Sequence, residues 1–308
     1  MMPGTCSRSK VLTMSVSDPV RRRSWLFVPA DSERKFTRAL ASEADVILLD
    51  LEDAIAESEK PTARRMAHDM LQARPDQTRR VWVRINPLHT MHALLDLAAI
   101  MPAAPAGIML PKVRSRADVE KLSHFLSAFE AASGREEGVT RIIIVATETA
   151  EALYQTHSYA DIARLTALTW GAEDLATAIG AISNRAEDGT YSFPYQMARS
   201  LCVTGSAVAG VAAIETMHGD FRDMDGLACT AAEARKAGFQ GMIAIHPDQV
   251  SVINHAFTPT AAELAEAQEI VALFAVNPQA GTLGFKGQML DRPHLLRAQA
   301  VLTLGAAA

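Results

Sequence analysis

The stretch VILLD, residues 46–50, decides the fold: four large aliphatic residues follow one another and end at Asp50. An unbroken aliphatic run of this length is typical of a strand that is buried on both faces of a parallel sheet. Four further apolar runs, at residues 81–83, 107–110, 142–146 and 168–170, are closely followed by Arg84, Lys112, Glu148 and Asp174. Each run precedes a helix-like stretch, so the chain repeats a βα unit.

Eight strands are expected from this rhythm, at residues 25–28, 46–50, 81–85, 107–110, 142–146, 165–170, 208–214 and 242–245. Eight units close a (β/α)8 TIM barrel, so we predict an α/β fold of that type. A doubly wound open sheet has the same alternation, but no GxGxxG motif lies between the first strand and its helix, which disfavours it. In a barrel the loops after the strands open on one face, so the charged residues are expected to share one pocket, as in an enzyme.

The chain is expected to divide into three parts. Residues 1–22 lack both an apolar period and the continuous hydrophobic core of a secretory signal, which predicts a flexible leader. Residues 23–258 form the expected barrel domain. Residues 259–308 exceed the length of one barrel unit and predict a C-terminal helical extension.

The extension itself has a readable pattern. Thr260 and Glu263 have capping-box spacing and begin a predicted helix that runs to about residue 274. A loop rich in Gly and Pro is expected at residues 277–287, and a last helix at residues 293–302. The apolar face of this extension must pack on its own barrel or on a neighbouring subunit.

Composition excludes several classes of function. The 308 residues carry a net charge of -5, whereas a general nucleic-acid binder needs a basic face. The three cysteines show no CxxC spacing, which favours a reducing compartment, and we expect the cytoplasm. No run of about 18 apolar residues is present, so no membrane span is expected.

Two acidic residues follow neighbouring strands of the predicted barrel. Glu148 and Asp174 come after the fifth and sixth strands, so their carboxylates are expected to lie close together. Mg2+ prefers hard oxygen ligands and keeps positions for water or substrate, so the pair predicts a magnesium site that Mn2+ can also fill. The alternative is that each acid only caps the helix that follows it.

Arg84 ends the third strand, in apolar surroundings that make an unpaired guanidinium costly. It is expected to hold a carboxylate or to stabilise a developing oxyanion. The alternative is a buried salt bridge to Asp50 or Glu52, residues of an acidic cluster after the second strand. Lys112 can neutralise a phosphate or carboxylate, although a surface role is equally compatible with its position.

Longer stretches resemble the citrate lyase beta-subunit-like family within the wider HpcH/HpaI group of aldolases and acyl-CoA lyases. These stretches are RSWLFVPADSERKFTRA (23–39), VILLDLEDAI (46–55), VWVRINPL (81–88), GIMLPKV (107–113), TETAEAL (147–153), GAEDL (171–175), FRDMDGL (221–227) and AIHPDQV (244–250). The resemblance implies a Mg2+-dependent barrel, a homotrimer or homohexamer, that cleaves or forms the C–C bond of a β-hydroxyacyl thioester. Thr147 departs from the pattern, because many relatives carry an aliphatic residue there.

The resemblance also implies roles for individual residues. Glu148 and Asp174 would hold the metal, and Arg84 would face the thioester carbonyl. The segment GQMLDRPHLLRAQAVL, residues 287–302, is similar to the end of free-standing malyl-CoA and citramalyl-CoA lyases, in which the Asp before the Pro reaches a neighbouring subunit's site. That residue is Asp291, which would protonate the enolate carbon. The candidates for binding the phosphates of coenzyme A are Arg23, Lys35 and Lys112.

The expected reaction is a retro-Claisen cleavage that releases acetyl-CoA or propionyl-CoA and a 2-oxo acid such as glyoxylate or pyruvate. Three alternatives stay open: hydrolysis of a malyl-CoA-type thioester, a citrate lyase beta subunit acting on a citryl thioester, and a non-catalytic subunit of a multienzyme lyase. The sequence leaves the acyl group open, because one methyl changes substrate preference by only about 1 to 3 kcal/mol.

Overall fold

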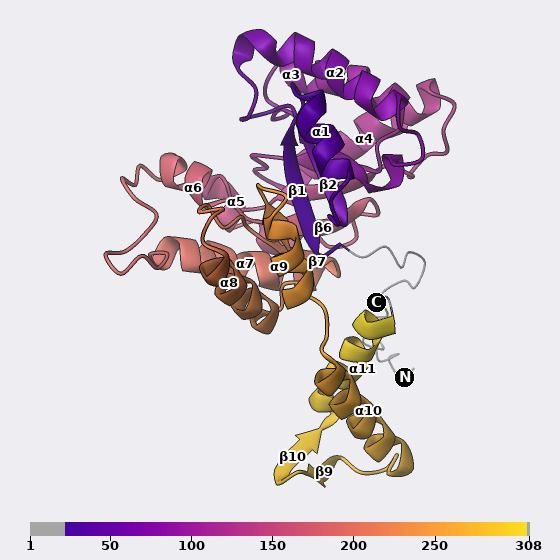
Figure 1. Cartoon of the computed structure of the whole chain (residues 1–308), viewed down its shortest axis with the longest axis vertical. Coiled ribbons are helices and arrows are strands. Elements are labelled where there is room, and N and C mark those ends of the chain that lie inside the picture. The colour runs from indigo at the N-terminus through magenta and orange to yellow at the C-terminus, as the bar shows by residue number, and fades with distance from the viewer. Residues whose placement is uncertain (1–21, 307–308) are drawn as a thin grey trace, which may run out of the picture.

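Eight parallel strands close into a barrel in the computed structural model, which describes residues 22–306 (Figure 1). The strands are β1 Ser24–Pro29, β2 Val46–Asp50, β3 Val81–Arg84, β4 Gly107–Leu110, β5 Arg141–Val145, β6 Leu165–Thr169, β7 Ala212–Glu215 and β8 Gly241–Ala244. They follow one another in chain order around the barrel, and β8 pairs with β1. The prediction of a (β/α)8 barrel is therefore confirmed and the open sheet excluded. The leader expected at residues 1–22 lies outside the described residues, apart from its last residue.

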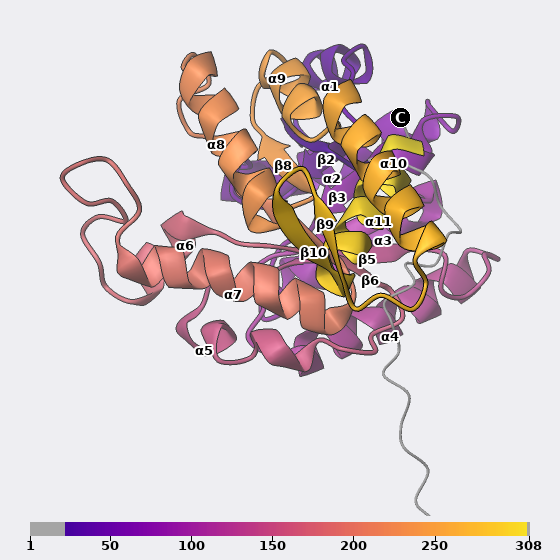
Figure 2. The same ribbon diagram turned by 90° about the horizontal axis from the view of Figure 1, so that it is seen from below.

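Helices cover the outside of the barrel (Figures 1 and 2). They are α1 Glu33–Leu40, α2 Lys60–Gln72, α3 His92–Ile100, α4 Arg116–Ala132, α5 Ala150–Leu153, α6 Ala172–Ala178, α7 Phe193–Ala209, α8 Met224–Ala237 and α9 Gln249–Ala256. Short 3-10 turns occur at Glu57–Glu59, Thr78–Arg80, Met101–Ala103 and Thr156–Ser158. Among residues 22–306, no helix combines the length and the apolar character needed to cross a membrane.

Large aromatic side chains fill the inside of the barrel. Trp25 of β1 and Trp82 of β3 meet edge to face with their ring centroids 5.1 Å apart, and both are fully buried. Gly107 on β4 makes room for this pair, because a Cβ atom there would lie 2.3 Å from the Trp82 ring. The interior is therefore a packed core rather than a channel, and ligands can only bind at the ends of the strands.

The direction of the strands separates the two ends of the barrel. All eight strands run the same way, so Asp50 and Arg84, the last residues of β2 and β3, lie side by side in register at the carboxyl end. Helix α9 runs back along the outside, so the chain leaves the barrel at the amino end of the strands (Figure 1). Everything after α9 therefore starts on the side of the barrel away from the strand carboxyl ends.

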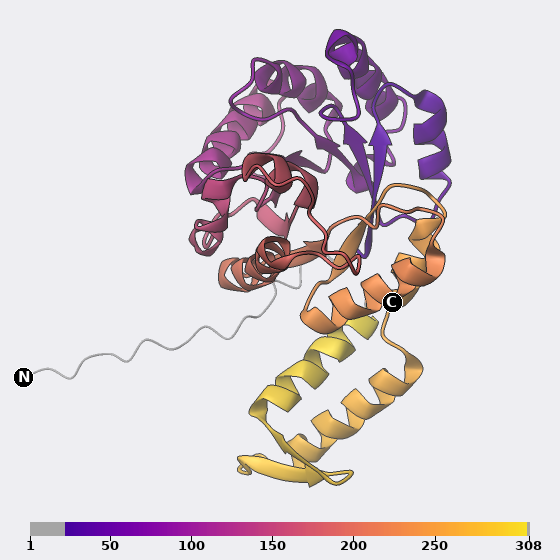
Figure 3. The same cartoon turned by 90° about the vertical axis from the view of Figure 1, so that its left-hand side faces the viewer.

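The C-terminal arm, residues 261–306, projects from the amino end of the barrel (Figures 1 and 3). It consists of α10 Ala261–Val276, the antiparallel strands β9 Thr282–Phe285 and β10 Gln288–Asp291, and α11 Arg292–Ala306. The two helices pack along each other, and the hairpin lies at the end of the arm far from the barrel (Figure 3).

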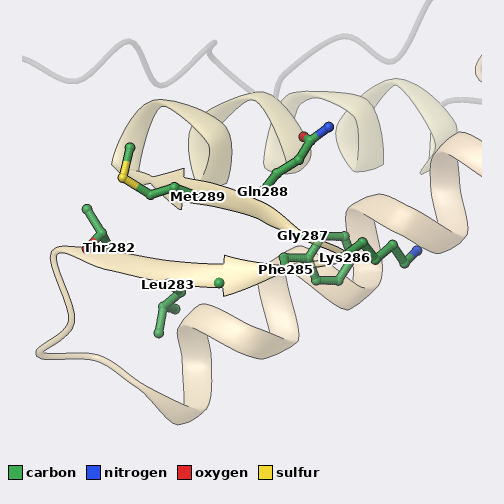
Figure 4. A pocket seen from close by; sticks show the side chains of 8 residues that line it. Thr282, Leu283, Phe285, Lys286, Gly287, Gln288 and Met289 are labelled. Carbon is green, nitrogen blue, oxygen red and sulfur yellow. The ribbon is translucent and has the colours of Figure 1, made fainter.

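Two element predictions are wrong. The Gly- and Pro-rich stretch expected as a loop at residues 277–287 contains strand β9, because Lys286 and Gly287 both adopt positive φ and close a tight hairpin (Figure 4). Strand seven was expected from residue 208, but α7 continues to Ala209 and ends at Gly210, whose left-handed backbone caps the helix.

Candidate metal and substrate site

Charged side chains from five strand ends meet at the carboxyl end of the barrel. Acidic residues come from the ends of β2, β5 and β6, and basic residues from the ends of β3 and β4. The members of this acidic cluster are Asp50, Glu52, Asp53, Glu148 and Asp174, and the cations among them are Arg84 and Lys112. The carboxylates outnumber the cations, so the cluster carries excess negative charge.

Arg84 is held firmly by Asp50. Its Nε and Nη2 atoms donate to the two carboxylate oxygens of Asp50 at 2.7 and 2.6 Å. Its Nη1 lies 2.9 Å from Glu52 Oε2, at ion-pair distance but without hydrogen-bond geometry, and the guanidinium covers the Phe27 ring at 4.6 Å. Burial lowers the pKa of Arg84, but the carboxylates of Asp50 and Glu52 raise it by a larger amount, so the guanidinium stays charged.

Arg84 therefore forms the buried salt bridge to Asp50 that the sequence offered as the alternative to a catalytic role. Asp50 accepts hydrogen bonds from only two of the five N–H groups of the Arg84 guanidinium, so three N–H groups are not bonded to Asp50. The side chain is 13% exposed, so the guanidinium is not fully enclosed by its partners. Asp50 thus orients Arg84, and Arg84 can still bind an oxygen.

Lys112 links the cluster through both its backbone and its side chain. Its φ of 51° places the residue in the left-handed region, directly after Pro111. In this conformation its N–H donates to Glu148 Oε2 at 2.6 Å. Its Nζ lies 2.5 Å from Glu52 Oε1 and 3.2 Å from Asp174 Oδ2, so one residue ties three strand ends together.

Glu148 is buried, with 5% of its surface exposed. Burial raises the pKa of its carboxyl to about 8, and the neighbouring charges of Asp174 and Glu52 add to the rise. Gly171 packs directly against it, since a Cβ atom there would lie 2.9 Å from Glu148 Cγ. Lys112 opposes this rise without cancelling it, so a bound cation would stabilise the carboxylate.

Asp174 lies in the first turn of α6, four residues beyond the apolar run that precedes it in sequence. Its side chain is 31% exposed and reaches Lys112, which also binds Glu148, so the structure brings the two predicted ligands together. Among residues 22–306, no group of three or more His, Cys, Asp or Glu is arranged to hold a metal ion. Mg2+ is nevertheless compatible with this oxygen-only pair, because it commonly takes one or two carboxylates and keeps several waters.

A buried polar network supports the loop that carries Glu52. The Lys60 ammonium donates to the backbone oxygens of Leu51 and Glu52 and to Asn86 Oδ1, at 3.2, 3.1 and 2.7 Å. Asn86 in turn donates to Asp96 at 2.7 Å. These bonds fix the loops after β2 and β3 and hence the positions of the charged side chains that they carry.

Sequence reasoning missed Glu215, the last residue of β7. Its buried carboxylate accepts from Trp170 Nε1 at 2.5 Å and from Arg199 Nε at 2.6 Å. Burial raises its pKa, and Arg199 opposes that rise. Because Trp170 is followed directly by Gly171, Glu215 anchors the segment that leads to Asp174. The signal was present, since an acid follows an apolar run here as it does at Asp50.

Three predicted residues lie apart from the cluster. Arg23 precedes β1 and pairs with Asp45 at the amino end of the barrel, where it also donates to Thr258. The strand direction therefore places Arg23 opposite the site, and we do not carry its predicted substrate role further. Lys35 is exposed in the first turn of α1, on the rim beside the carboxyl end of β1. Asp291 is the last residue of β10 on the arm, which projects from the amino end of the barrel, whereas the cluster lies at the carboxyl end (Figures 1 and 3).

Two concavities show where open space exists. One of about 90 Å3 lies beside Lys112 and is also lined by Leu110, Arg114 and Lys121. A shallow one of about 570 Å3 follows the β9–β10 hairpin (Figure 4). The hairpin concavity lacks carboxylates, so the chemistry of the side chains, rather than the size of the hollow, locates the candidate site at the acidic cluster.

Comparison with known proteins agrees with this geometry. Residues 23–247 match the family model described as HpcH/HpaI aldolase/citrate lyase. The citrate lyase subunit beta-like protein of Mycobacterium tuberculosis is 34% identical, over 90% of this chain and 93% of its own length. The mitochondrial citramalyl-CoA lyase of Mus musculus is 33% identical, over 92% of this chain and 86% of its own.

A solved structure has the same architecture. The CitE protein of Mycobacterium tuberculosis, in complex with magnesium, acetoacetate and coenzyme A, superposes with a TM-score of 0.77 at 33% identity. The match covers 94% of this chain and 99% of the other. The chain therefore belongs to the HpcH/HpaI aldolase/citrate lyase family, and it is a carbon–carbon lyase.

Proposed function

We propose that the chain is a Mg2+-dependent acyl-CoA lyase that cleaves or forms the C–C bond of a β-hydroxyacyl-CoA such as malyl-CoA or citramalyl-CoA. The products of cleavage are acetyl-CoA or propionyl-CoA and a 2-oxo acid. The observation that carries the proposal is the buried Glu148 carboxylate, which sits with Asp174 in a cluster short of positive charge and beside an oriented arginine. The Mycobacterium tuberculosis relative bound to magnesium, acetoacetate and coenzyme A supports the same ligand classes.

Glu148 and Asp174 would hold the metal. When bound, Mg2+ would act as a Lewis acid toward the substrate's hydroxyl and adjacent carboxylate. The N–H of Lys112 fixes one oxygen of Glu148, which leaves the other free as a ligand. Gly171 presses against the same side chain and limits the positions it can take.

Arg84 would bind the thioester oxygen, where negative charge develops as the bond breaks. The bidentate pair with Asp50 holds the guanidinium before substrate arrives, so little reorganisation is needed during the reaction. The Phe27 ring covers one face of the guanidinium and excludes water from it. Lys35, exposed on the rim, is our candidate for the coenzyme A phosphates, whereas the Lys112 ammonium is already held by carboxylates.

The metal assignment can be tested by thermal unfolding with and without Mg2+. A ligand that binds only the folded state stabilises it, by about 2.7 kcal/mol at a hundredfold excess over Kd. We expect Mg2+ to raise the Tm of the parent protein and to leave Asp174→Ala unchanged. Asp174→Asn keeps the shape and removes the charge, so it should also lose most of the response. If both variants respond like the parent, Asp174 is not a ligand.

The C-terminal arm would complete the site of a neighbouring subunit in a homotrimer or homohexamer. We keep the division into a barrel domain, residues 23–258, and an extension, residues 259–308, as part of this proposal. Large apolar side chains are exposed both on the arm and on loops after the strands, which would let the two surfaces pack together. These side chains are Val276, Met289 and Leu296 on the arm, and Met91, Tyr154 and Phe193 on the loops and helices after β3, β5 and β6. Asp291, carried by the arm, would protonate the enolate carbon.

Mixing inactive variants tests this arrangement. In hetero-oligomers of Asp291→Asn and Glu148→Ala chains, some sites combine an intact Glu148 with a neighbour's intact Asp291, so part of the activity should return. The control mixes Glu148→Ala with Asp174→Ala, which should stay inactive because one barrel must supply both residues. If mass spectrometry verifies chain exchange and the first mixture stays as inactive as the control, the intersubunit role of Asp291 must be dropped.

Two finer points remain part of the proposal. The cytoplasm is our expected location, because Cys202 and Cys229 are both free thiols in the part of the chain that the structure describes. A thioesterase outcome and a citrate lyase beta-subunit role differ from the proposed reaction in their products and substrates, so product analysis separates them.

A further inference from the structure

Asp291 and His294 form a close pair on the arm, which we call the arm dyad. Asp291 is the last residue of β10, and His294 lies three residues on, in the first turn of α11. His294 Nδ1 lies 2.5 Å from Asp291 Oδ1, and the backbone N–H of Asp291 points at the same ring nitrogen at 3.3 Å. Both side chains remain more than a third exposed in the single chain, at 38% and 34%.

A hydrogen must lie between the two side chains. Carboxylate Oδ1 and a bare ring nitrogen both present lone pairs, which repel at this distance unless a proton is shared. We assign the proton to Nδ1, so that His294 donates to Oδ1 at 2.5 Å and the longer approach of the Asp291 N–H, at 3.3 Å, is not a hydrogen bond. The other carboxylate oxygen, Oδ2, is then the one left to act on a ligand.

We propose that His294 is a positioning residue for Asp291: it holds Oδ1 and thereby presents Oδ2 as the oxygen that exchanges a proton with the substrate carbon. The inference rests on the proposed function, because it needs Asp291 to meet a substrate in a neighbouring barrel. It assigns to the arm a second residue with a role in the proton transfer.

The proton balance of this step is simple. In cleavage, the Asp291 Oδ2–H bond breaks and a C–H bond forms at the enolate carbon, so the negative charge moves from the enolate to the carboxylate. In condensation, the carboxylate takes the same proton back. The Nδ1–H of His294 stays in place in both directions and stabilises the carboxylate when it carries the charge.

The electrostatics agree with this role. The hydrogen bond from His294 is the largest influence on Asp291, and it lowers the pKa of that carboxyl. The other charged groups on the elements around the arm dyad are Arg292 and Arg297 on α11, Glu263, Glu266 and Glu269 on α10, and Lys286 in the hairpin turn, which pairs with Glu269 at 2.9 Å. A lowered pKa makes the carboxylate a weaker base and its acid form a stronger proton donor.

Helix capping is the purely structural alternative. Asp is a favoured residue before the first turn of a helix, and the backbone N–H of His294 also contributes to the lowered pKa of Asp291. Capping needs only that backbone N–H, whereas the proposal needs the imidazole. The two explanations therefore make different predictions for substitutions of the His294 side chain.

The test compares His294→Ala with His294→Asn, whose amide nitrogen can still donate to Oδ1 but does not titrate. We expect kcat of His294→Ala to fall roughly tenfold to a hundredfold, the effect of a misplaced reacting group, with KM and Mg2+ binding little changed. In the condensation direction, where Asp291 acts as the base, the acid limb of its pH profile should move to higher pH. His294→Asn should recover most of kcat and keep the limb near that of the parent. His255→Ala, at an exposed position on α9, is the control and should change neither.

A second measurement does not depend on turnover. NMR of 13C-labelled aspartate, with Asp291→Asn to assign the signal, follows the Asp291 carboxyl in the free protein, and its pKa should rise in His294→Ala but not in His294→Asn. If that shift is seen but no thioester is cleaved, the arm dyad stands and the proposed function fails. If cleavage occurs and His294→Ala alters neither the carboxyl titration nor the pH profile, the arm dyad is only a helix cap and this inference is overturned.

Discussion

Arg84→Lys separates the catalytic role of Arg84 from its structural one. Lysine keeps the positive charge but loses the planar fork that matches both oxygens of Asp50, at 2.7 and 2.6 Å. A lysine ammonium can pair with only one of these oxygens, and the contact of Arg84 Nη1 with Glu52 is also lost. The substitution therefore disturbs a buried ion pair and a substrate contact at the same time.

The two effects have different expected sizes. Leaving buried partners incompletely bonded costs about 1 to 3 kcal/mol of stability. For a chain longer than 250 residues this lowers Tm by roughly 2 °C for each kcal/mol. Removing a preorganised donor from a developing oxyanion lowers kcat by roughly tenfold to a thousandfold, which is about 1.4 to 4 kcal/mol of activation free energy.

Arg164→Lys is a matched control. Arg164 also forms a buried bidentate pair, with Glu130 at 2.9 and 2.7 Å, but it directly precedes β6 and so lies at the amino end of the barrel. Thermal unfolding should show a similar loss of stability in both variants. Thioester cleavage, followed by trapping the released 2-oxo acid with phenylhydrazine, should show a fall in kcat for Arg84→Lys alone.

The comparison can refute the reasoning in a definite way. Equal losses of Tm with an unchanged kcat in Arg84→Lys would show that Arg84 serves only the salt bridge to Asp50. A rise in KM without a fall in kcat would assign Arg84 to ground-state binding instead of stabilisation of the transition state.

Two further predictions concern the metal ligand and the acid stability of the fold. Gly171→Ala places a Cβ atom 2.9 Å from Glu148 Cγ and should weaken Mg2+ binding, measured by calorimetry, roughly tenfold to a hundredfold. Gly281→Ala is the control, because that position has open space around it and the substitution should leave the affinity unchanged. Equal Mg2+ affinities in the two variants would show that the Glu148 side chain adapts freely. Burial raises the pKa of Glu130, but hydrogen bonds, first among them those of Arg164, lower it to about 2, below its ordinary 4.5. The free energy of unfolding of the parent should exceed that of Glu130→Gln by about 3 to 5 kcal/mol above pH 4.5, and this difference should vanish as the pH falls toward 2. Urea titrations that show a constant difference across this pH range would contradict the prediction.

The barrel could be predicted because its strands are continuous aliphatic runs. Residues 46–50 and 107–110 coincide with β2 and β4, since a strand buried on both faces leaves no polar position to blur its ends. The predicted start of β7 was wrong, because the apolar residues 208–209 are compatible with either a helix or a strand. The end of α7 is set only by the left-handed backbone of Gly210. The hairpin was missed because Gly and Pro around its short strands suggested a loop.

The sequence was enough to predict which residues form the candidate site, but not the hydrogen bonds between them. Strand ends in a barrel converge, which was enough to bring Glu148 and Asp174 together. The sequence does not reveal that Lys112 takes a left-handed backbone and donates its N–H to Glu148, because that bond depends on the path of a loop. Strand direction could have excluded Arg23 from the predicted site, because Arg23 precedes β1 instead of following it and therefore lies at the amino end of the barrel.

The central claim is Mg2+-dependent C–C cleavage of a β-hydroxyacyl-CoA, and one experiment tests it most directly. Purified protein is stripped with EDTA, divided, and incubated with malyl-CoA, citramalyl-CoA and citryl-CoA, each with and without added Mg2+, and the products are identified by mass spectrometry. We predict that only the Mg2+ samples release a shorter acyl-CoA and a 2-oxo acid in equal amounts from at least one of these thioesters. Cleavage at full rate in the metal-free samples, or release of free coenzyme A with the hydroxy acid intact, would contradict the account.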